Sequence, residues 1–262
     1  MPARPAPRDD YVERMAEQHA GDTPVANVDA DAAGLEVRTV DYASLDGRPV
    51  SGYLARPAEA DGPLPALIVI HEWWGLNDNI RAMTRRLAAA GHVALAVDLY
   101  EGEAATEPGN ARALMQAAMD APGRVRRNLR QAFHYLDAMP GVGRIASIGW
   151  CFGGGWSLRT ALLFPEALDA AVIYYGRLVT EREALAPLAM PIQGHFGAED
   201  DGIPVANVRR FERVLDELGK THEIHVYEGA GHAFANPSGT RYVEEAAEKA
   251  WERTLAFLER HL

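Results

Sequence analysis

The sequence is poor in cysteine and in positive charge, and it has no long hydrophobic run. One cysteine among 262 residues excludes an intramolecular disulfide, which suits a reducing compartment. The 37 acidic side chains outnumber 26 basic ones and give a net charge of −11, which disfavours nucleic acid and anionic membranes as partners. No stretch approaches the roughly 18 apolar residues of a membrane span. The N-terminus lacks the apolar core of a signal peptide. We therefore expect a cytoplasmic protein that binds neither nucleic acid nor membrane.

The chain divides into a short arm and one domain. Residues 1–33 are rich in proline, alanine and aspartate, and we interpret them as a weakly ordered N-terminal arm on the domain surface. The alternative is a short helix from Tyr11 to His19, with Val12, Met15 and Ala16 on one face. Residues 34–262 are predicted to form a single catalytic domain. The sequence is compatible with a monomer and with a homodimer.

Apolar runs typical of buried strands alternate with amphipathic segments typical of helices. A hairpin is expected first, from residues 36–42 and 50–55 around Asp46-Gly47. The expected strands that follow are 66–70, 92–98, 145–150, 170–175, 190–196 and 223–227. The expected helices are 77–90, 109–119, 124–139, 156–164, 205–218 and 242–262. This alternation predicts an α/β fold with a mostly parallel central sheet, an antiparallel N-terminal hairpin and helices on both faces.

The single cysteine lies between an expected strand and an expected helix. Gly149-Trp150-Cys151-Phe152-Gly153 fits the G-x-S-x-G nucleophile elbow, with cysteine in the serine position. Glycines are needed there because larger residues would collide at the strained turn. The N-terminus of the following helix favours a thiolate through its partial positive charge. Cys151 is therefore the predicted nucleophile.

A thiol nucleophile needs a base, and the base needs an orienting acid. In α/β-hydrolases the acid and then the histidine follow the nucleophile along the chain. His232 lies in a glycine-flanked loop after an expected strand and is the predicted base. The acid is Asp200 or Asp201, which spacing alone does not separate, with Glu199 as a weaker third choice. Both loops follow the carboxyl ends of parallel strands, where open α/β sheets hold their sites.

Five short stretches together resemble the dienelactone hydrolase family, which consists of α/β-hydrolases of the carboxymethylenebutenolidase type. They are His71-Glu72-Trp73-Trp74-Gly75-Leu76-Asn77, Asp98-Leu99-Tyr100, Gly149 to Gly154, Gly197 to Asp200, and Gly231 to Phe234. The resemblance extends from about Val37 to Leu262. It implies a triad of Cys151, His232 and Asp200, which resolves the choice between the two aspartates.

The resemblance also assigns two further functions. It implies that the Glu72 carboxylate interacts with the resting thiol and assists its ionisation; the alternative is a structural acid behind the site. It further implies an oxyanion hole formed by the backbone N–H groups of Trp73 and Phe152.

The sequence departs from the family where a substrate carboxylate would bind. The dienelactone-cleaving members carry an arginine just after Asp-Leu-Tyr and another shortly after the catalytic histidine. Here Glu101 follows Tyr100 and adds negative charge, and no arginine follows His232 before Asn236. An anionic substrate would lack a fork-shaped partner, although Arg81, Arg177 or Arg241 could reach in from elsewhere.

The expected substrate is therefore neutral or held by apolar contacts. The candidate walls of its pocket are aromatic, and for Trp150 a place in the core is equally expected. They are Trp73, Trp74, Tyr100, Trp150 and Phe234.

The expected reaction is hydrolysis of a carboxylic ester or lactone through an acyl-cysteine, with the Cys151 thiolate initially paired with protonated His232. The triad accounts for the site without a metal ion or an organic cofactor. A thioesterase or acyltransferase on the same residues is one alternative. The other is a non-catalytic binding protein or redox sensor based on Cys151.

Overall fold

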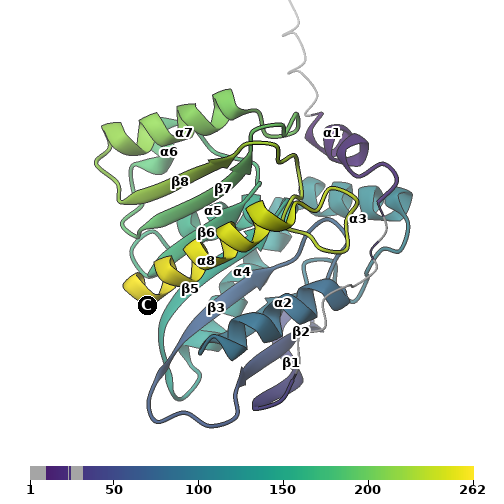
Figure 1. Ribbon diagram of the computed structural model, residues 1–262. Helices are drawn as coiled ribbons and strands as arrows, with labels where there is room; N and C mark the ends of the chain where they lie inside the picture. Colours follow the sequence, from purple (N-terminus) through teal and green to yellow (C-terminus); the bar gives the residue numbers. More distant parts are fainter. Residues whose placement is uncertain (1–9, 23, 25–31) are drawn as a thin grey trace, which may run out of the picture.

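The computed structural model describes residues 10–22, 24 and 32–262, and this part of the chain forms one eight-stranded sheet in the order β1-β2-β4-β3-β5-β6-β7-β8 (Figure 1). Strands β3 to β8 run parallel, whereas β1 and β2 form an antiparallel hairpin that joins the sheet at β4. The strands are β1 (Leu35–Leu45), β2 (Arg48–Pro57), β3 (Leu64–Ile70), β4 (Val93–Val97), β5 (Val142–Trp150), β6 (Ala170–Tyr174), β7 (Ile192–Gly197) and β8 (His222–Tyr227).

Helices cover both faces of this sheet. In Figure 1, α2 and α8 lie in front of the strands, α4 and α5 lie behind them, and α7 borders β8. The helices are α1 (Tyr11–Gln18), α2 (Asp78–Ala89), α3 (Pro108–Asp120), α4 (Pro122–Asp137), α5 (Phe152–Leu163), α6 (Arg182–Leu185), α7 (Val205–Glu217) and α8 (Glu244–His261). This architecture confirms the predicted α/β-hydrolase fold.

The central strands are apolar because both of their faces are covered. Every residue of β4 and β6 is buried, as expected for parallel strands between two helical layers. Their carboxyl ends, and those of β5, β7 and β8, therefore meet at one edge of the sheet, where the loops carry the polar side chains of the site. None of the helices in the described residues combines the length and the apolar character needed to cross a bilayer.

The structure places one helix boundary differently from the sequence prediction. Helix α5 begins at Phe152, directly after the cysteine, and not at Trp156. Gly153, Gly154 and Gly155 have low helix propensity, yet they are helical here and buried. Neighbouring backbone lies so close to Gly153 and Gly154 that a side chain would not fit: a Cβ on Gly153 would lie 2.2 Å from the carbonyl oxygen of Ile70. Tertiary packing thus outweighs the local preference.

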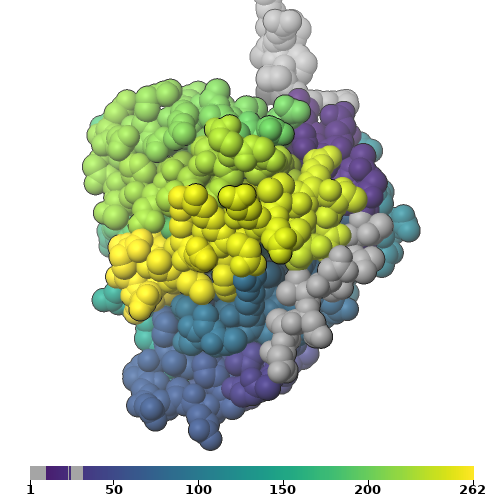
Figure 2. Space-filling model, viewed as in Figure 1, coloured from purple at the N-terminus to yellow at the C-terminus, as the bar shows by residue number. Residues whose placement is uncertain are grey.

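The N-terminal segment also differs from the expected surface arm. Tyr11 to Gln18 form helix α1, whose Tyr11, Val12 and Met15 are buried. In Figure 2, α1 (purple) abuts the yellow-green segment that precedes α8. Residues 1–9, 23 and 25–31 of the predicted arm lie outside the described residues. The described part of the arm is therefore integrated into the domain.

Candidate active site

The sharp turn between β5 and α5 presents the cysteine sulfur at the edge of the sheet. Cys151 has φ 53° and ψ −117°, a left-handed conformation that side-chain-bearing residues rarely adopt. Its N–H donates to the carbonyl of Tyr174 at 3.0 Å, which ties the turn to β6. A Cβ on Gly149 would lie 2.2 Å from the carbonyl oxygen of Gly153. The glycine spacing found in the sequence therefore has the steric cause that we predicted for it.

The loops after β7 and β8 bring His232 and Asp200 together. Nδ1 of His232 lies 2.8 Å from Oδ2 of Asp200, and both side chains are buried. The other Asp200 oxygen accepts the N–H groups of Gly202 at 2.8 Å and Ile203 at 2.9 Å. Asp201 and Glu199, the alternative acids, are exposed. Nε2 of His232 is buried and has no hydrogen-bond partner among the described residues.

A second histidine, which we did not predict, contacts the sulfur. Nε2 of His19 lies 3.7 Å from Sγ of Cys151, and Nδ1 of His19 lies 2.9 Å from Oδ2 of Asp22. The His19 ring stacks on Trp73 with centroids 4.4 Å apart. Sδ of Met15 lies 3.9 Å from the same sulfur. The local signal was the apolar face of α1, followed within four residues by His19 and Asp22.

These neighbours favour the thiolate. Burial alone would raise the pKa of Cys151, but the charge of His232 and the hydrogen bond with His19 outweigh it and lower the pKa to about 6. Burial lowers the pKa of each histidine, but the opposing effects are larger. Asp200 and Cys151 hold the pKa of His232 well above its usual value. Asp22 and Cys151 raise the pKa of His19. Proton transfer from the thiol to an imidazole is therefore favoured.

Glu72 lies buried at the same edge of the sheet. Its Oε2 accepts a hydrogen bond from Nδ2 of Asn236 at 2.6 Å, and its Oε1 accepts one from the Tyr175 hydroxyl at 3.4 Å. Burial, together with the negative charge of Cys151, raises the pKa of Glu72 to about 7. The carboxyl group is thus electrostatically coupled to the thiol. Asn236, which occupies the region where the family arginine was expected, binds this carboxyl group.

The two expected oxyanion donors lie in different elements. Phe152 is the first residue of α5, so its N–H has no partner within the helix. Trp73 lies in the loop after β3, and its indole is covered by His19. Their function as oxyanion donors stays a prediction.

The aromatic candidates for the pocket wall separate into two groups. Trp74 borders the site, because its ring lies 6.3 Å from that of His19 and 4.9 Å from that of Trp73. The others pack mainly against further aromatic rings: Tyr100 on His71 and Phe152, Trp150 on Tyr174, and Phe234 on Tyr175 and Tyr227. Their contact with substrate also stays a prediction.

One set of donors in the site is also suitable for a metal ion. The sulfur of Cys151 and a ring nitrogen from each of His19 and His232 lie within 4.8 Å of one another. A thiolate with two imidazoles is a ligand set that zinc accepts. The aspartates on the far side of both rings would orient the histidines equally well as metal ligands or as bases.

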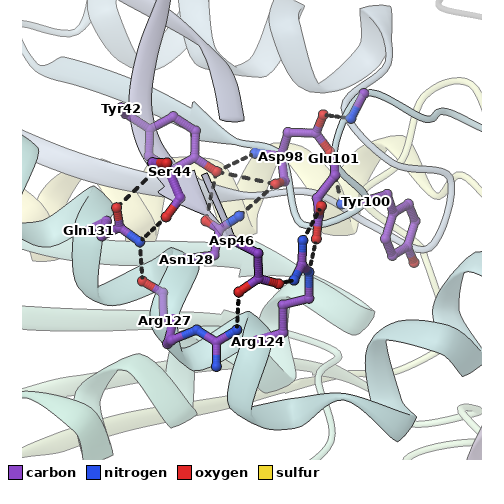
Figure 3. Close-up of polar contacts among 11 residues, drawn as sticks. Tyr42, Ser44, Asp46, Asp98, Tyr100, Glu101, Arg124, Arg127, Asn128 and Gln131 are labelled. Carbon is purple, nitrogen blue, oxygen red and sulfur yellow. Dashed lines mark hydrogen bonds and ion pairs between the residues drawn. The ribbon is translucent and has the colours of Figure 1, made fainter. Parts of the chain in front are cut away.

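The charge next to the expected carboxylate position is neutralised. We expected Glu101 to add uncompensated negative charge, but Nη2 of Arg124 donates to its Oε2 at 2.7 Å, and Arg124 also binds Asp46 (Figure 3). The pKa of Glu101 is lowered, chiefly by the hydrogen bonds from Arg124. The carboxylate is therefore ionised and paired.

The three arginines considered as substitutes lie in different surroundings. Arg81 pairs with Asp78 at 3.0 Å, and the Arg177 guanidinium lies over the ring of Tyr11. Arg241 lines a shallow depression of about 480 Å³ that also reaches His232 and Thr240. Of the three, Arg241 is the one that lines a depression shared with His232.

Known proteins resemble this chain over most of its length. Residues 50–262 match the model of the dienelactone hydrolase family. A protein of Saccharolobus solfataricus named "Putative carboxymethylenebutenolidase" is 34% identical, over 82% of this chain and 95% of its own length. A Bradyrhizobium protein named "Probable 2-oxo-3-(5-oxofuran-2-ylidene)propanoate lactonase" is 32% identical, over 80% of this chain and 89% of its own length. The crystal structure of a "Putative Dienelactone Hydrolase" from Klebsiella pneumoniae is 31% identical and superposes with a TM-score of 0.77, covering 87% of this chain and 99% of that one. The chain therefore belongs to the dienelactone hydrolase family and is a carboxylic-ester hydrolase.

Proposed function

We propose that this protein hydrolyses a neutral carboxylic ester or lactone through an acyl-cysteine formed on Cys151. The observation that supports this most directly is the set of buried groups around the sulfur: a histidine oriented by Asp200, and a thiol whose pKa is lowered to about 6. A lowered pKa provides thiolate at neutral pH, and the thiolate is the nucleophilic form. The aspartate fixes the ring and stabilises the imidazolium that forms during the reaction.

The reaction would proceed in two stages. The thiolate attacks the substrate carbonyl, and the N–H groups of Trp73 and Phe152 stabilise the tetrahedral oxyanion. A protonated histidine beside Cys151 donates a proton to the leaving oxygen. His232, oriented by Asp200, then accepts a proton from water, whose oxygen attacks the acyl-cysteine and releases the acid. Each oxyanion donor of this kind typically contributes about 3 kcal/mol to stabilising the transition state.

Two features favour a neutral substrate. The position where the family carries its first carboxylate-binding arginine holds Glu101, which is paired with Arg124. Near the second position, Asn236 binds Glu72. Neither place offers a free cation to a substrate carboxylate. Arg241, at the depression beside His232, is the nearby cation whose contribution an anionic substrate would reveal.

The test is a panel of short esters and lactones, neutral and anionic, assayed on the wild type and on Cys151→Ala and His232→Gln. We expect kcat to fall by roughly 10⁴-fold or more in both variants, because nucleophile and base act as a unit. Higher kcat/KM for the neutral substrates would support the proposed specificity. Full turnover by Cys151→Ala would disprove the acyl-cysteine.

Added alcohol or amine distinguishes hydrolysis from acyl transfer. A hydrolase gives the free acid as the main product, whereas an acyltransferase gives the new ester or amide. Thioesters in the same panel test for thioesterase activity. The redox-sensor alternative predicts no esterase turnover even in the wild type.

A further inference from the structure

Helix α1 is fastened to the domain by contacts at several points. Glu13 forms an ion pair with Arg112 on α3, and Oε1 of Gln18 accepts a hydrogen bond from Arg241 at 2.6 Å. Asp22, four residues after the helix, accepts hydrogen bonds from the N–H and the hydroxyl of Thr240. The contacts of Gln18 and Asp22, on either side of His19, position the end of α1 over the sulfur of Cys151.

The His19 pair has the same geometry as the pair of the proposed triad. In each pair Nδ1 faces an aspartate, at 2.9 Å for His19 and at 2.8 Å for His232. In each pair the ring is almost fully buried. Of the two, His19 has its Nε2 within hydrogen-bonding distance of the sulfur, at 3.7 Å, whereas Nε2 of His232 has no partner among the described residues.

Because a neutral histidine whose Nδ1–H faces an aspartate has an unprotonated Nε2, His19 is set to accept a proton from the thiol. We propose that His19, oriented by Asp22, is a second catalytic histidine, which takes the thiol proton of Cys151 and passes it to the leaving group. This proposal rests on the proposed function, since it needs Cys151 as the nucleophile. It leaves His232 to serve as the base for water in the acyl-enzyme, where the thiolate charge that helps to raise the pKa of His232 is gone.

The protons balance over one cycle. The S–H proton moves to Nε2 of His19, the S–C bond forms, the C–O bond breaks, and the leaving oxygen takes that proton. His232 then takes one proton from water as the hydroxyl adds to the acyl carbon. The C–S bond breaks, the thiolate departs with its electron pair, and His232 returns the proton to the sulfur. The acid and the alcohol are released.

The acyl group needs space beside the sulfur, and Met15 occupies it in this structure. Met15 has a flexible unbranched side chain, and its Sδ contacts Sγ of Cys151 at 3.9 Å. His19 is held by both Asp22 and the stack on Trp73. We therefore place the acyl group where the Met15 thioether lies, with His19 retained beside it.

The test compares two acetate esters on the wild type, His19→Gln and Glu13→Gln. The alkyl ester has a basic leaving group that needs a proton, whereas p-nitrophenolate leaves without one. We expect His19→Gln to lower kcat/KM about 100-fold or more for the alkyl ester, the usual contribution of general acid–base catalysis. The loss for the p-nitrophenyl ester should be about tenfold smaller. Glu13→Gln, the control on the outer side of α1, should change both less than about threefold.

A second readout follows the thiolate itself. Because Cys151 is the single cysteine, the ultraviolet absorbance of the thiolate reports its ionisation directly. We expect the midpoint near pH 6 in the wild type and at higher pH in His19→Gln. Assays with and without EDTA would show whether a zinc ion on the same three atoms affects the result.

Four outcomes would overturn the proposal. Equal losses for the two esters would mean that His19 only holds the structure together. Faster turnover in His19→Gln would mean that the segment around His19 inhibits the enzyme by blocking access to Cys151. A loss that disappears with EDTA would assign His19 to metal binding. If Cys151→Ala is inactive while His19→Gln keeps wild-type acylation, the second histidine is disproved and the acyl-cysteine is not.

Discussion

Cys151 lies between two histidine–aspartate pairs that are held by very different parts of the chain. On one side, the loops after β7 and β8 present Asp200 and His232, within the region that matches the family. On the other side, an eight-residue helix presents His19, and Asp22 follows it; both lie before residue 50, where the family match begins. The comparison indicates that a buried thiol can receive an oriented imidazole from the sheet and from an appended segment alike.

The supports also differ in how their aspartates are held. Asp200 accepts two backbone N–H groups from its own loop, a local arrangement that forms with the loop. Asp22 depends on Thr240, from the opposite end of the chain. The position of His19, directly after α1, therefore depends on the assembly of distant parts of the chain.

Replacing each aspartate by asparagine should give the largest difference in kcat between the two histidine–aspartate pairs. Asp200→Asn should lower kcat by about 10⁴-fold, because the imidazole that activates water loses its orientation and its tautomer. Asp22→Asn should lower kcat for an alkyl ester about 10-fold, since stacking on Trp73 still holds the His19 ring. Steady-state kinetics of both variants with that ester measure the difference. Losses of equal size would remove the distinction that we draw between the two pairs.

Glu72→Gln tests whether a third group tunes the thiolate between the two histidines. The pKa of Cys151 is about 6 and that of Glu72 is about 7, so acylation should rise with pH through both values. Above pH 7 the ionised Glu72 makes the neighbouring thiolate more nucleophilic. Glutamine should abolish the second rise, which we put at about threefold from the dependence of thiolate nucleophilicity on its pKa. A profile that keeps both steps would disprove this function of Glu72.

Thr240→Val should give the smallest effect. It removes the hydroxyl donor to Asp22 and leaves the backbone N–H of residue 240 in place. We expect about a twofold lower kcat/KM for the alkyl ester, because one of several hydrogen bonds to the carboxylate is lost. In an Asp22→Asn background the same substitution should have no further effect. Additive losses would show that Thr240 acts independently of the pair on α1.

The elbow and the order of the candidate residues could be predicted because their signals are local. Glycines at fixed spacing around Cys151 indicate a turn that only glycine tolerates. A histidine loop after an aspartate loop follows from the order of parallel strands. The choice of Asp200 over Asp201 needed the family resemblance, and the structure pairs Asp200 with His232.

His19 was missed because its position depends on long-range contacts. The apolar face of α1 is visible in the sequence, but eight residues are too short to form a stable helix alone. Their conformation depends on docking to α3 and to the segment before α8. The pairing of Glu101 with Arg124 was missed for the same reason: the two residues are 23 positions apart and meet through packing. Local pattern predicts what a loop contains, and tertiary packing decides what it contacts.

The contact between Asp22 and Thr240 joins residues 218 positions apart in the sequence. During synthesis, Asp22 is made well before Thr240 and remains without this partner until the chain has grown past residue 240. The entropic cost of closing a loop rises slowly with its length, and non-local contacts of this kind form slowly. A segment before the family match and the segment that precedes α8 therefore meet beside the cysteine, so that the thiol obtains its complete surroundings only after this long-range contact has formed.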